Sequence, residues 1–431
     1  MEIRPFRGFR FRVPSGSDVS AFIAPPYDIF SAQAKVALLA RNRDNIVAVD
    51  LPHMPPNEGG PDAAYAAAAE KLRQWIASGI LCREDKPSVY AYQQDFTLAG
   101  KEYSRRSMLC SIRLAPFGQE VLPHEHTFAG PKADRLKLTQ HARMQLSPIF
   151  GFFRDEGEQS MTRLWSATRK RSPNAVGTLG GVKETLFAVK DEHVIHDVRL
   201  ALAGEPVFIA DGHHRYTTAL NYRDTLLREG KIDLTHPANY VLFALVARSD
   251  PAMLILPTHR LIRGLKADFS VPKLVKAAGE FSWRKVPMER VDFRDGGESI
   301  RLLCPHAFAL LDAKSGELWI AKLEDSQAMK LAAPDEGDAW RELDVAILHK
   351  LLIEKALAKW TKTEPPTIEY THDGQAVLAA CGAGKAQLGI LLAGTPIESI
   401  ETIARAGAAM PHKSTYFYPK LTTGMVLMPL E

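Results

Sequence analysis

The chain has 431 residues, 46% of them hydrophobic, which is enough for a large buried core and for two or three domains. Its formal net charge of +4, with no basic block interleaved with aromatic residues, argues against direct nucleic-acid binding. No apolar stretch reaches the roughly 18 residues of a membrane span, and the N-terminus lacks an apolar segment of signal-peptide length. The four cysteines are scattered, with no C-x-x-C pair, as in a reducing compartment. We therefore expect a cytoplasmic protein that binds a small molecule, with no nucleic-acid or membrane partner. Whether two copies form a homodimer is left open by the sequence.

The first half of the chain alternates predicted strands and helices. Residues 1–30 are extended and contain a rigid proline loop at 24–28. An alanine-rich helix at 62–80 precedes a predicted hairpin. The remaining elements predicted up to residue 262 are hairpin strands at 88–97 and 103–114, a basic helix at 133–145, a strand at 147–153, a helix at 159–171, a strand at 206–210, a helix at 216–229, and a second hairpin of strands at 239–248 and 252–262.

The second half continues this alternation. Helices are predicted at 271–280, 296–303, 340–360 and 374–381, and strands at 307–312, 317–322 and 387–392. We expect an α+β fold with mixed sheets. Two domains are predicted, a catalytic region at 1–264 and a C-terminal α/β domain at 265–431 that packs against the catalytic cleft.

The densest group of reactive side chains is the run Asp211-Gly212-His213-His214-Arg215. It lies between a predicted strand and a predicted helix, where unpaired backbone N–H groups and the helix dipole favour an anion. Gly212 lets the backbone approach a ligand, and Arg215 can clamp a phosphate or carboxylate. Asp211 can hold a cation or accept a proton. Alternatively, Asp211 is only the N-cap of the helix and the two histidines are surface residues.

A second group is His124-Glu125-His126. Its spacing is not that of the H-E-x-x-H zinc helix, because the imidazoles are two residues apart instead of four. In one interpretation Glu125 is a general base for a hydroxyl proton. In another, His124, His126, His213 and His214 bind a transition metal. The third alternative is a solvated polar loop without a catalytic role.

Several cations are candidates for neutralising an anionic ligand. Lys132 and Arg135 follow Glu125 within about ten residues and could neutralise phosphoryl oxygens. His259 and Arg260 stand at the end of a predicted strand. Lys413 and Lys420 belong to a C-terminal run rich in cations, hydroxyls and aromatic rings, which could cover a site or pack into the core.

Seven segments together resemble the bacterial domain-of-unknown-function family 1015. They begin with Ala24-Pro25-Pro26-Tyr27-Asp28 and end with the run from Lys413 to Lys420, and the likeness extends along the whole chain. Between these ends lie the runs 124–128, 130–132, 134–136, 210–216 and 256–260. The chain has no Walker A, Rossmann, G-x-S-x-G or kinase H-R-D signature. The family resemblance by itself implies no activity.

The run Asp211-Gly212-His213-His214-Arg215 also resembles the signature loop of free-serine kinases with a ParB/sulfiredoxin-like fold. This resemblance covers about half of the chain and implies a nucleotide- or phosphate-binding unit in the first domain. It implies that Asp211 supports phosphoryl transfer and that Gly212 and the three residues after it cradle phosphates. Glu125 is the candidate base, although its surroundings match no kinase motif.

These observations predict a small-molecule kinase of serine metabolism. It would transfer a phosphoryl group from ATP, ADP or pyrophosphate to the hydroxyl of free L-serine or a similar compound, with Mg²⁺ held by Asp211. Lys132 and Arg135 would bind the donor, and His259, Arg260, Lys413 and Lys420 are the candidates for substrate binding. The segments near 24–28, 122–135 and 207–216 should then meet in one cleft. A metal-dependent hydrolase and a non-enzymatic nucleotide-binding module are the alternatives.

Overall fold

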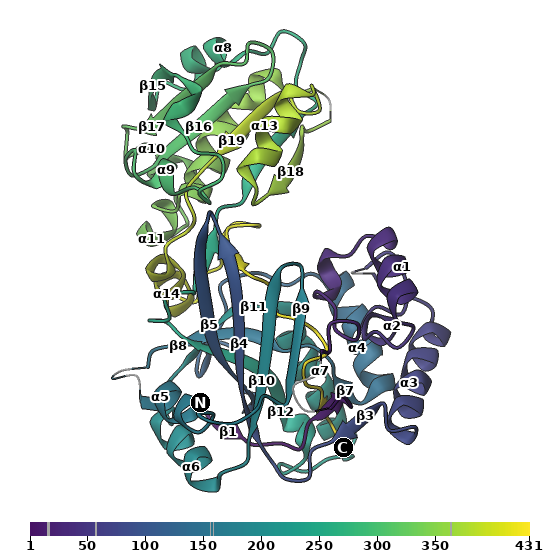
Figure 1. Ribbon diagram of the computed structural model, residues 1–431. Helices are drawn as coiled ribbons and strands as arrows, with labels where there is room; N and C mark the ends of the chain where they lie inside the picture. Colours follow the sequence, from purple (N-terminus) through teal and green to yellow (C-terminus); the bar gives the residue numbers. More distant parts are fainter. Residues whose placement is uncertain (15–17, 57, 156, 158, 363) are drawn as a thin grey trace. The chain divides into compact units, whose positions relative to one another are not determined.

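The computed structural model describes residues 1–14, 18–56, 58–155, 157, 159–362 and 364–431, and divides into two compact units (Figure 1). Unit 1 comprises Met1–Met253 and Pro419–Glu431, and unit 2 comprises Leu254–Tyr418. This division differs from the boundary expected at 264/265. Strand β13 (Leu254–Leu256) pairs with β20 (Tyr416–Tyr418) inside unit 2, whereas the last residues of the chain pair with the N-terminal region of unit 1.

Unit 1 is built around a large mixed sheet. The strand order is β6-β11-β8-β12-β5-β4-β10-β9, and β1 pairs with β5. The strands of the unit are β1 (Ile3–Arg4), β2 (Phe9–Phe11), β3 (Leu81–Arg83), β4 (Val89–Leu98), β5 (Lys101–Arg113), β6 (Val121–Leu122), β7 (Met144–Gln145), β8 (Ile149–Phe153), β9 (Ala175–Leu179), β10 (Val182–Val189), β11 (Val207–Asp211), β12 (Tyr240–Ala247) and β21 (Met428–Pro429).

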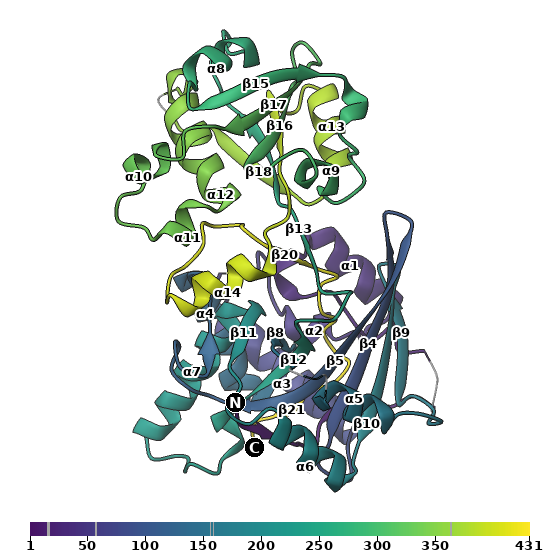
Figure 2. The ribbon, with the colours of Figure 1, turned by 90° about the vertical axis from the view of Figure 1, so that its left-hand side faces the viewer.

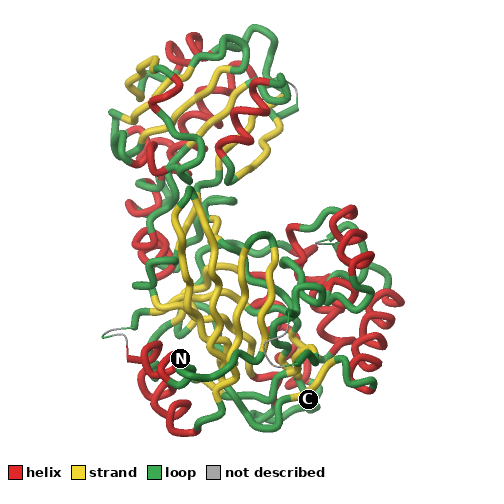
Figure 3. Tube along the Cα trace, viewed as in Figure 1, coloured by secondary structure: helices red, strands yellow, loops and turns green. Residues whose placement is uncertain are grey.

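Helices pack on this sheet and beside it (Figure 3). Their bounds are η1 (Tyr27–Ile29), α1 (Ala32–Arg41), α2 (Val47–Asp50), α3 (Asp62–Ala77), α4 (Ala129–Ala142), α5 (Gln159–Ser166), α6 (Glu192–Ala201), α7 (His213–Arg228) and η2 (Pro237–Asn239). Alternate residues of the central strand β12, such as Phe243 and Leu245, share one core with apolar residues of α5, α6 and α7. Apolar residues of α2 and α3 form a second core with β2 and Leu427.

Unit 2 has an antiparallel sheet of order β15-β17-β16-β19-β14-β18, seen in Figure 2. Its strands are β13, β14 (His259–Arg263), β15 (Phe281–Val286), β16 (Ala307–Asp312), β17 (Leu318–Leu323), β18 (Thr367–Thr371), β19 (Leu388–Leu391) and β20. Its helices are α8 (Val271–Ala277), η3 (Met288–Arg290), α9 (Glu298–Arg301), α10 (Ala328–Ala332), α11 (Asp338–Arg341), α12 (Asp344–Ile347), the π-helical η4 (Leu348–Ala356), η5 (Leu357–Trp360), α13 (Gly374–Gly382) and α14 (Ile397–Arg405).

The protein is therefore α+β with several sheets, as predicted. The hairpin expected at 239–262 is wrong, because β12 pairs with β5 and β8 while β13 and β14 belong to sheets of unit 2. Helix α4 begins four residues and helix α7 three residues earlier than predicted, which places Lys132 in the first turn of α4 and His213, His214 and Arg215 in the first turn of α7. No helix of the described residues is long and apolar enough to cross a membrane.

Candidate functional site

The candidate site is built where β11 ends and α7 begins. Strand β11 runs parallel to β6 and antiparallel to β8, so Asp211 lies at the end of a paired, buried strand. Gly212 then adopts φ +99°, and an ideal Cβ there would lie 2.9 Å from Nε of Arg215. A side chain at residue 212 would therefore strain the backbone and meet the guanidinium. The first N–H groups of α7 point out of this loop without intrahelical partners.

Asp211 is held as a carboxylate by two cations. Nζ of Lys420 donates to its Oδ2 at 2.5 Å, and Nη2 of Arg215 lies 3.6 Å from its Oδ1. Burial raises the pKa of the Asp211 carboxyl, but the charges of Lys420 and Arg215 outweigh that effect and hold the pKa well below its usual range. Arg215 also donates to the carbonyl oxygen of Pro148. Lys420 thus joins the site from a segment 209 residues away in sequence.

His213 connects this loop to Glu125. Its Nε2 accepts a hydrogen bond from the backbone N–H of His124 at 3.2 Å, so the neutral ring carries its hydrogen on Nδ1. That Nδ1 lies 3.7 Å from Oε2 of Glu125. Burial lowers the pKa of His213 well below its ordinary value, and burial also lowers the pKa of His124 to about 4. Both rings are therefore neutral near pH 7, and Glu125, which is about one-third exposed, faces an N–H instead of a full charge.

His214, in the first turn of α7, contacts the N-terminus of α4. Its Nε2 accepts from the backbone N–H of Phe128, the residue before α4, at 2.9 Å, and its ring stacks on the ring of Phe128. Burial lowers the pKa of His214, while the nearby charges of Asp28 and Lys132 act in opposite directions. The segments around residues 28, 124–132 and 211–215 therefore meet here. Two helix N-termini and Lys132 supply groups that favour an anion, next to the carboxylates of Asp28 and Asp211.

Arg135 does not point to this loop as a donor-binding residue would. It is buried, its Nε donates to Oδ2 of Asp134 at 2.7 Å, and its Nη1 donates to the backbone oxygen and to Oδ1 of Asp50. Its guanidinium also lies 3.9 Å from the centre of the Tyr27 ring. Two carboxylates already neutralise it, so the structure gives Arg135 a structural environment instead of the phosphate contact expected from the sequence.

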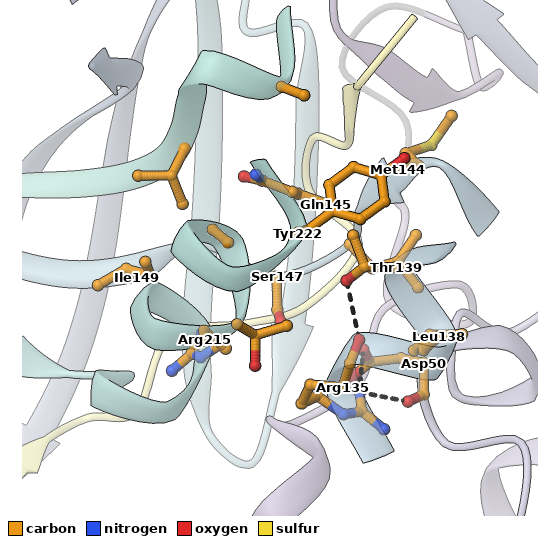
Figure 4. Close-up of a pocket in the computed structure, with 15 residues that line it drawn as sticks. Asp50, Arg135, Leu138, Thr139, Met144, Gln145, Ser147, Ile149, Arg215 and Tyr222 are labelled. Carbon is orange, nitrogen blue, oxygen red and sulfur yellow. Dashed lines mark hydrogen bonds and ion pairs between the residues drawn. The ribbon is translucent and has the colours of Figure 1, made fainter. Parts of the chain in front are cut away.

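A small cavity lies next to Arg215 (Figure 4). Its volume is about 50 Å³, and Arg215 and the Arg135–Asp50 pair line it together with apolar side chains such as Met144 and Tyr222. Small-molecule sites usually measure about 300–1,000 Å³, so this space suits a few water molecules and not a nucleoside.

A buried polar network, which the sequence analysis missed, holds the segment that carries Lys420. On neighbouring strands β5, β4 and β10, Arg105, Gln94 and Glu184 are directly opposite one another. Arg105 donates to the carbonyl oxygen of Pro419 at 2.6 Å, and Gln94 donates to that of Lys420 at 3.2 Å. The sequence carries no clear sign of this network, because each of the three residues stands beside another polar residue in its strand.

The carboxyl of Glu184 is enclosed by this network. Tyr92 donates to Oε2 at 2.5 Å, and Thr422 donates to Oε1 at 2.6 Å. Burial raises the pKa of Glu184 to about 7, although these hydrogen bonds and Arg105 act in the opposite direction. The terminal segment is thus fixed by bonds on both sides of Lys420, which fixes where its ammonium group meets Asp211.

The other sequence candidates lie elsewhere. His259, Arg260 and Lys413 belong to unit 2, where Arg260 is fully buried in β14. The four-histidine metal site is not formed: Nε2 of His213 and of His214 both accept backbone hydrogen bonds. His126 is exposed, and no group of three or more His, Cys, Asp or Glu residues in the described part of the chain is arranged to hold a metal ion.

Comparison with known proteins identifies the family. The model of the family described as "Protein of unknown function (DUF1015)" matches residues 3–346, so the chain belongs to this family. No curated protein matches the chain. Among solved structures, a free serine kinase in complex with AMP is similar with a TM-score of 0.33 and 11% identity, over 74% of this chain and 92% of that one.

Two further solved structures show a similar degree of likeness. A conserved hypothetical protein from Pyrococcus furiosus has a TM-score of 0.33 and 12% identity, over 74% of this chain and 95% of that one. SbnI with a C-terminal truncation, from Staphylococcus aureus, has a TM-score of 0.33 and 10% identity, over 75% of this chain and 87% of that one.

Proposed function

We propose that this protein is a phosphotransferase that uses the Asp211–Arg215 loop to pass a phosphoryl group from a nucleotide or pyrophosphate to the hydroxyl of free L-serine or a similar compound. One observation carries the proposal: His213 lies near two carboxylates, Asp211 and Glu125, which differ in their exposure and in the charges beside them. Asp211 is partly buried, with a side chain 22% exposed, and is kept ionised by Lys420 and Arg215. Glu125 is more exposed and faces a neutral ring. The same proposal includes a ParB/sulfiredoxin-like fold for unit 1.

The proposed division of work follows from these environments. The donor phosphates bind at the N-termini of α7 and α4, near Lys132, His214 and Arg215. Glu125 accepts the proton of the substrate hydroxyl while that oxygen forms its bond to phosphorus. The bond from phosphorus to the bridging oxygen of the donor breaks, and the shortened donor leaves with that electron pair. Phosphoryl transfer needs mainly positioning and charge neutralisation, which this set of groups supplies.

The residues present fit a magnesium ion. Mg²⁺ is usually held by one or two carboxylates together with phosphate oxygens. Oδ1 of Asp211, which faces Arg215 across 3.6 Å, is the oxygen that would hold it. When bound, the ion would neutralise charge on the transferring phosphoryl group. Lys420 keeps Asp211 ionised and so preserves this oxygen as a ligand.

The test is an assay for phosphoserine by ³¹P NMR, with purified protein, L-serine, Mg²⁺ and ATP, ADP or pyrophosphate in turn. We expect product with one donor, and loss of product in Asp211→Asn. Lys385→Ala, an exposed lysine of unit 2, is the control that keeps the rate of the unaltered protein. Nucleotide binding without turnover of any donor would replace the kinase by the nucleotide-binding module. A folded protein with neither binding nor turnover would refute both.

A further inference from the structure

Unit 2 buries an arginine whose charge no acidic side chain matches. The guanidinium of Arg260 in β14 is fully buried. Its Nη1 donates to the carbonyl oxygen of Thr258, and its Nη2 donates to that of Lys413 at 3.2 Å and lies 3.2 Å from Nε2 of His349. All three partners are neutral acceptors. Within the residues that the structure describes, Arg260 makes no ion pair, and its buried Nε has no hydrogen-bond partner.

Other buried arginines of this protein have carboxylates near them. Arg135 of unit 1 contacts the carboxylates of both Asp50 and Asp134. Arg105 donates to Gln94, which itself donates to Glu184. Buried charges are normally paired because an isolated one loses its hydration without compensation. Arg260, in contrast, lacks a neighbouring anion that would balance its charge.

The groups next to Arg260 supply no negative charge, and its charge disfavours protonation of the two histidines beside it. Burial lowers the pKa of His349 to about 4, and the charge of Arg260 contributes to this shift. Burial also lowers the pKa of His412, with Lys413 and Arg260 acting in the same direction. These neighbours come from two separate segments of unit 2, namely η4 and the loop before β20. An anion among them would relieve the repulsion that disfavours each cation.

We propose that Arg260, His349, His412 and Lys413 form a binding site in unit 2 for a small oxyanion, a phosphate or carboxylate group. Arg260 offers its Nε–H, Lys413 offers a charge, and His412 offers a ring that an anion would help to protonate; both His412 and Lys413 are exposed. The ring of Tyr370 covers the guanidinium at 5.2 Å and is itself 36% exposed. The site lies wholly within unit 2 and does not depend on the function proposed for the Asp211 loop.

The test follows the histidine ring signals of the full-length protein by NMR during titration with inorganic phosphate and, separately, with acetate. The signal that disappears in His412→Gln identifies the ring next to the site. We expect an anion to shift this signal, and the ion that binds more tightly tells which oxyanion the site takes. A local signal separates this site from phosphate bound at the Asp211 loop.

Three variants sharpen the result. Lys413→Glu reverses the rim charge and should weaken binding at least tenfold. Arg260→Met removes the guanidinium at similar length and should abolish the shift. Lys385→Glu makes the same charge change as Lys413→Glu at another exposed position of unit 2 and should bind as the unaltered protein does. The proposal is overturned if neither ion moves the His412 signal, or if Lys413→Glu and Lys385→Glu bind alike.

Discussion

Arg135 in unit 1 and Arg260 in unit 2 are both buried, but their charges meet opposite surroundings. Arg135 lies among Asp50, Asp134 and the ring of Tyr27, so its charge is compensated within the protein. Arg260 lies among two carbonyl oxygens, a histidine and the ring of Tyr370. The first arrangement holds elements of unit 1 together. The second leaves a positive charge that an anionic ligand can balance.

The comparison shows that residue type alone does not reveal the role of a cation. From the sequence, both arginines were candidates for contact with an anionic ligand. The structure separates them by their counter-charges: a neutralised guanidinium acts on the fold, and an unmatched one, or one shared with a single carboxylate as Arg215 is, remains able to bind an anion. The following variants test this distinction.

The largest expected effect is on stability. Arg135→Met leaves two buried carboxylates without their cation and should lower the free energy of unfolding by about 3–5 kcal/mol. Arg260→Met removes an unmatched charge along with hydrogen bonds to two carbonyl oxygens, so the net loss should be at most about 2 kcal/mol. Hydrogen exchange in urea measures each unit separately. Equal losses in the two variants would contradict the distinction.

Lys420 should affect the Asp211 loop through charge. In Lys420→Met the carboxylate loses the cation that donates to it, and turnover should fall about 10- to 100-fold, the range of a charge-assisted hydrogen bond. The pKa of Asp211 should also rise toward its ordinary value. The acid limb of the pH–rate profile then moves to higher pH, which a purely structural role of Lys420 would not produce. Lys385→Met serves as the matched control.

Glu184 should give the stability of unit 1 a distinctive pH dependence. Its folded-state pKa of about 7 lies above the ordinary value of 4.5, so the folded protein binds the extra proton. Its contribution to stability is therefore complete below pH 4.5 and is lost as the pH rises toward 7, by at most about 1.4 kcal/mol per pH unit. Tyr92, Gln94, Thr422 and Arg105 are the groups that face it.

The variant Glu184→Gln keeps the shape of the side chain and removes this titration. Urea unfolding at pH 4.5, 5.5 and 7 should show a flatter profile in the variant than in the unaltered protein. A slope that survives the substitution would assign the titration to another group.

The smallest expected effect concerns His126. The exposed ring of this residue is not required by the proposed mechanism, so His126→Ala should keep the phosphotransfer rate within about twofold. A metal-dependent hydrolase that used this histidine would instead lose its metal. Metal analysis of both proteins after purification without chelator decides between the two. Near-stoichiometric zinc, manganese or iron that disappears in the variant would restore the hydrolase.

Local features of the fold were predictable from the sequence. The strand, glycine turn and helix around Asp211 follow from an apolar run, a residue that tolerates φ > 0 and helical spacing, all within about twenty residues. The hairpin of β4 and β5 was predictable because two strand-like runs flank a short turn at 98–101. The expected hairpin at 239–262 failed because a strand pattern does not say which sheet a strand joins.

The site depends on contacts that the local sequence does not encode. Lys420 reaches Asp211 across 209 residues, and the bonds that fix its segment come from three strands of the main sheet. The neutral state of His213 depends on burial and on a backbone N–H from another loop. Counter-charges such as those of Arg135 are equally non-local. For this reason the local sequence could not predict which partners these residues meet.

The central claim is that the Asp211 loop binds the phosphoryl donor while Glu125 activates the acceptor. It is tested most directly by comparing Glu125→Gln and Arg215→Ala in single-turnover transfer and in donor binding by calorimetry. We predict that Glu125→Gln lowers the rate by about 10²–10⁴-fold with donor affinity unchanged. Arg215→Ala should weaken donor binding, because it removes a charge-assisted contact. An unchanged rate in Glu125→Gln, or unchanged donor affinity in Arg215→Ala, would contradict this division of work.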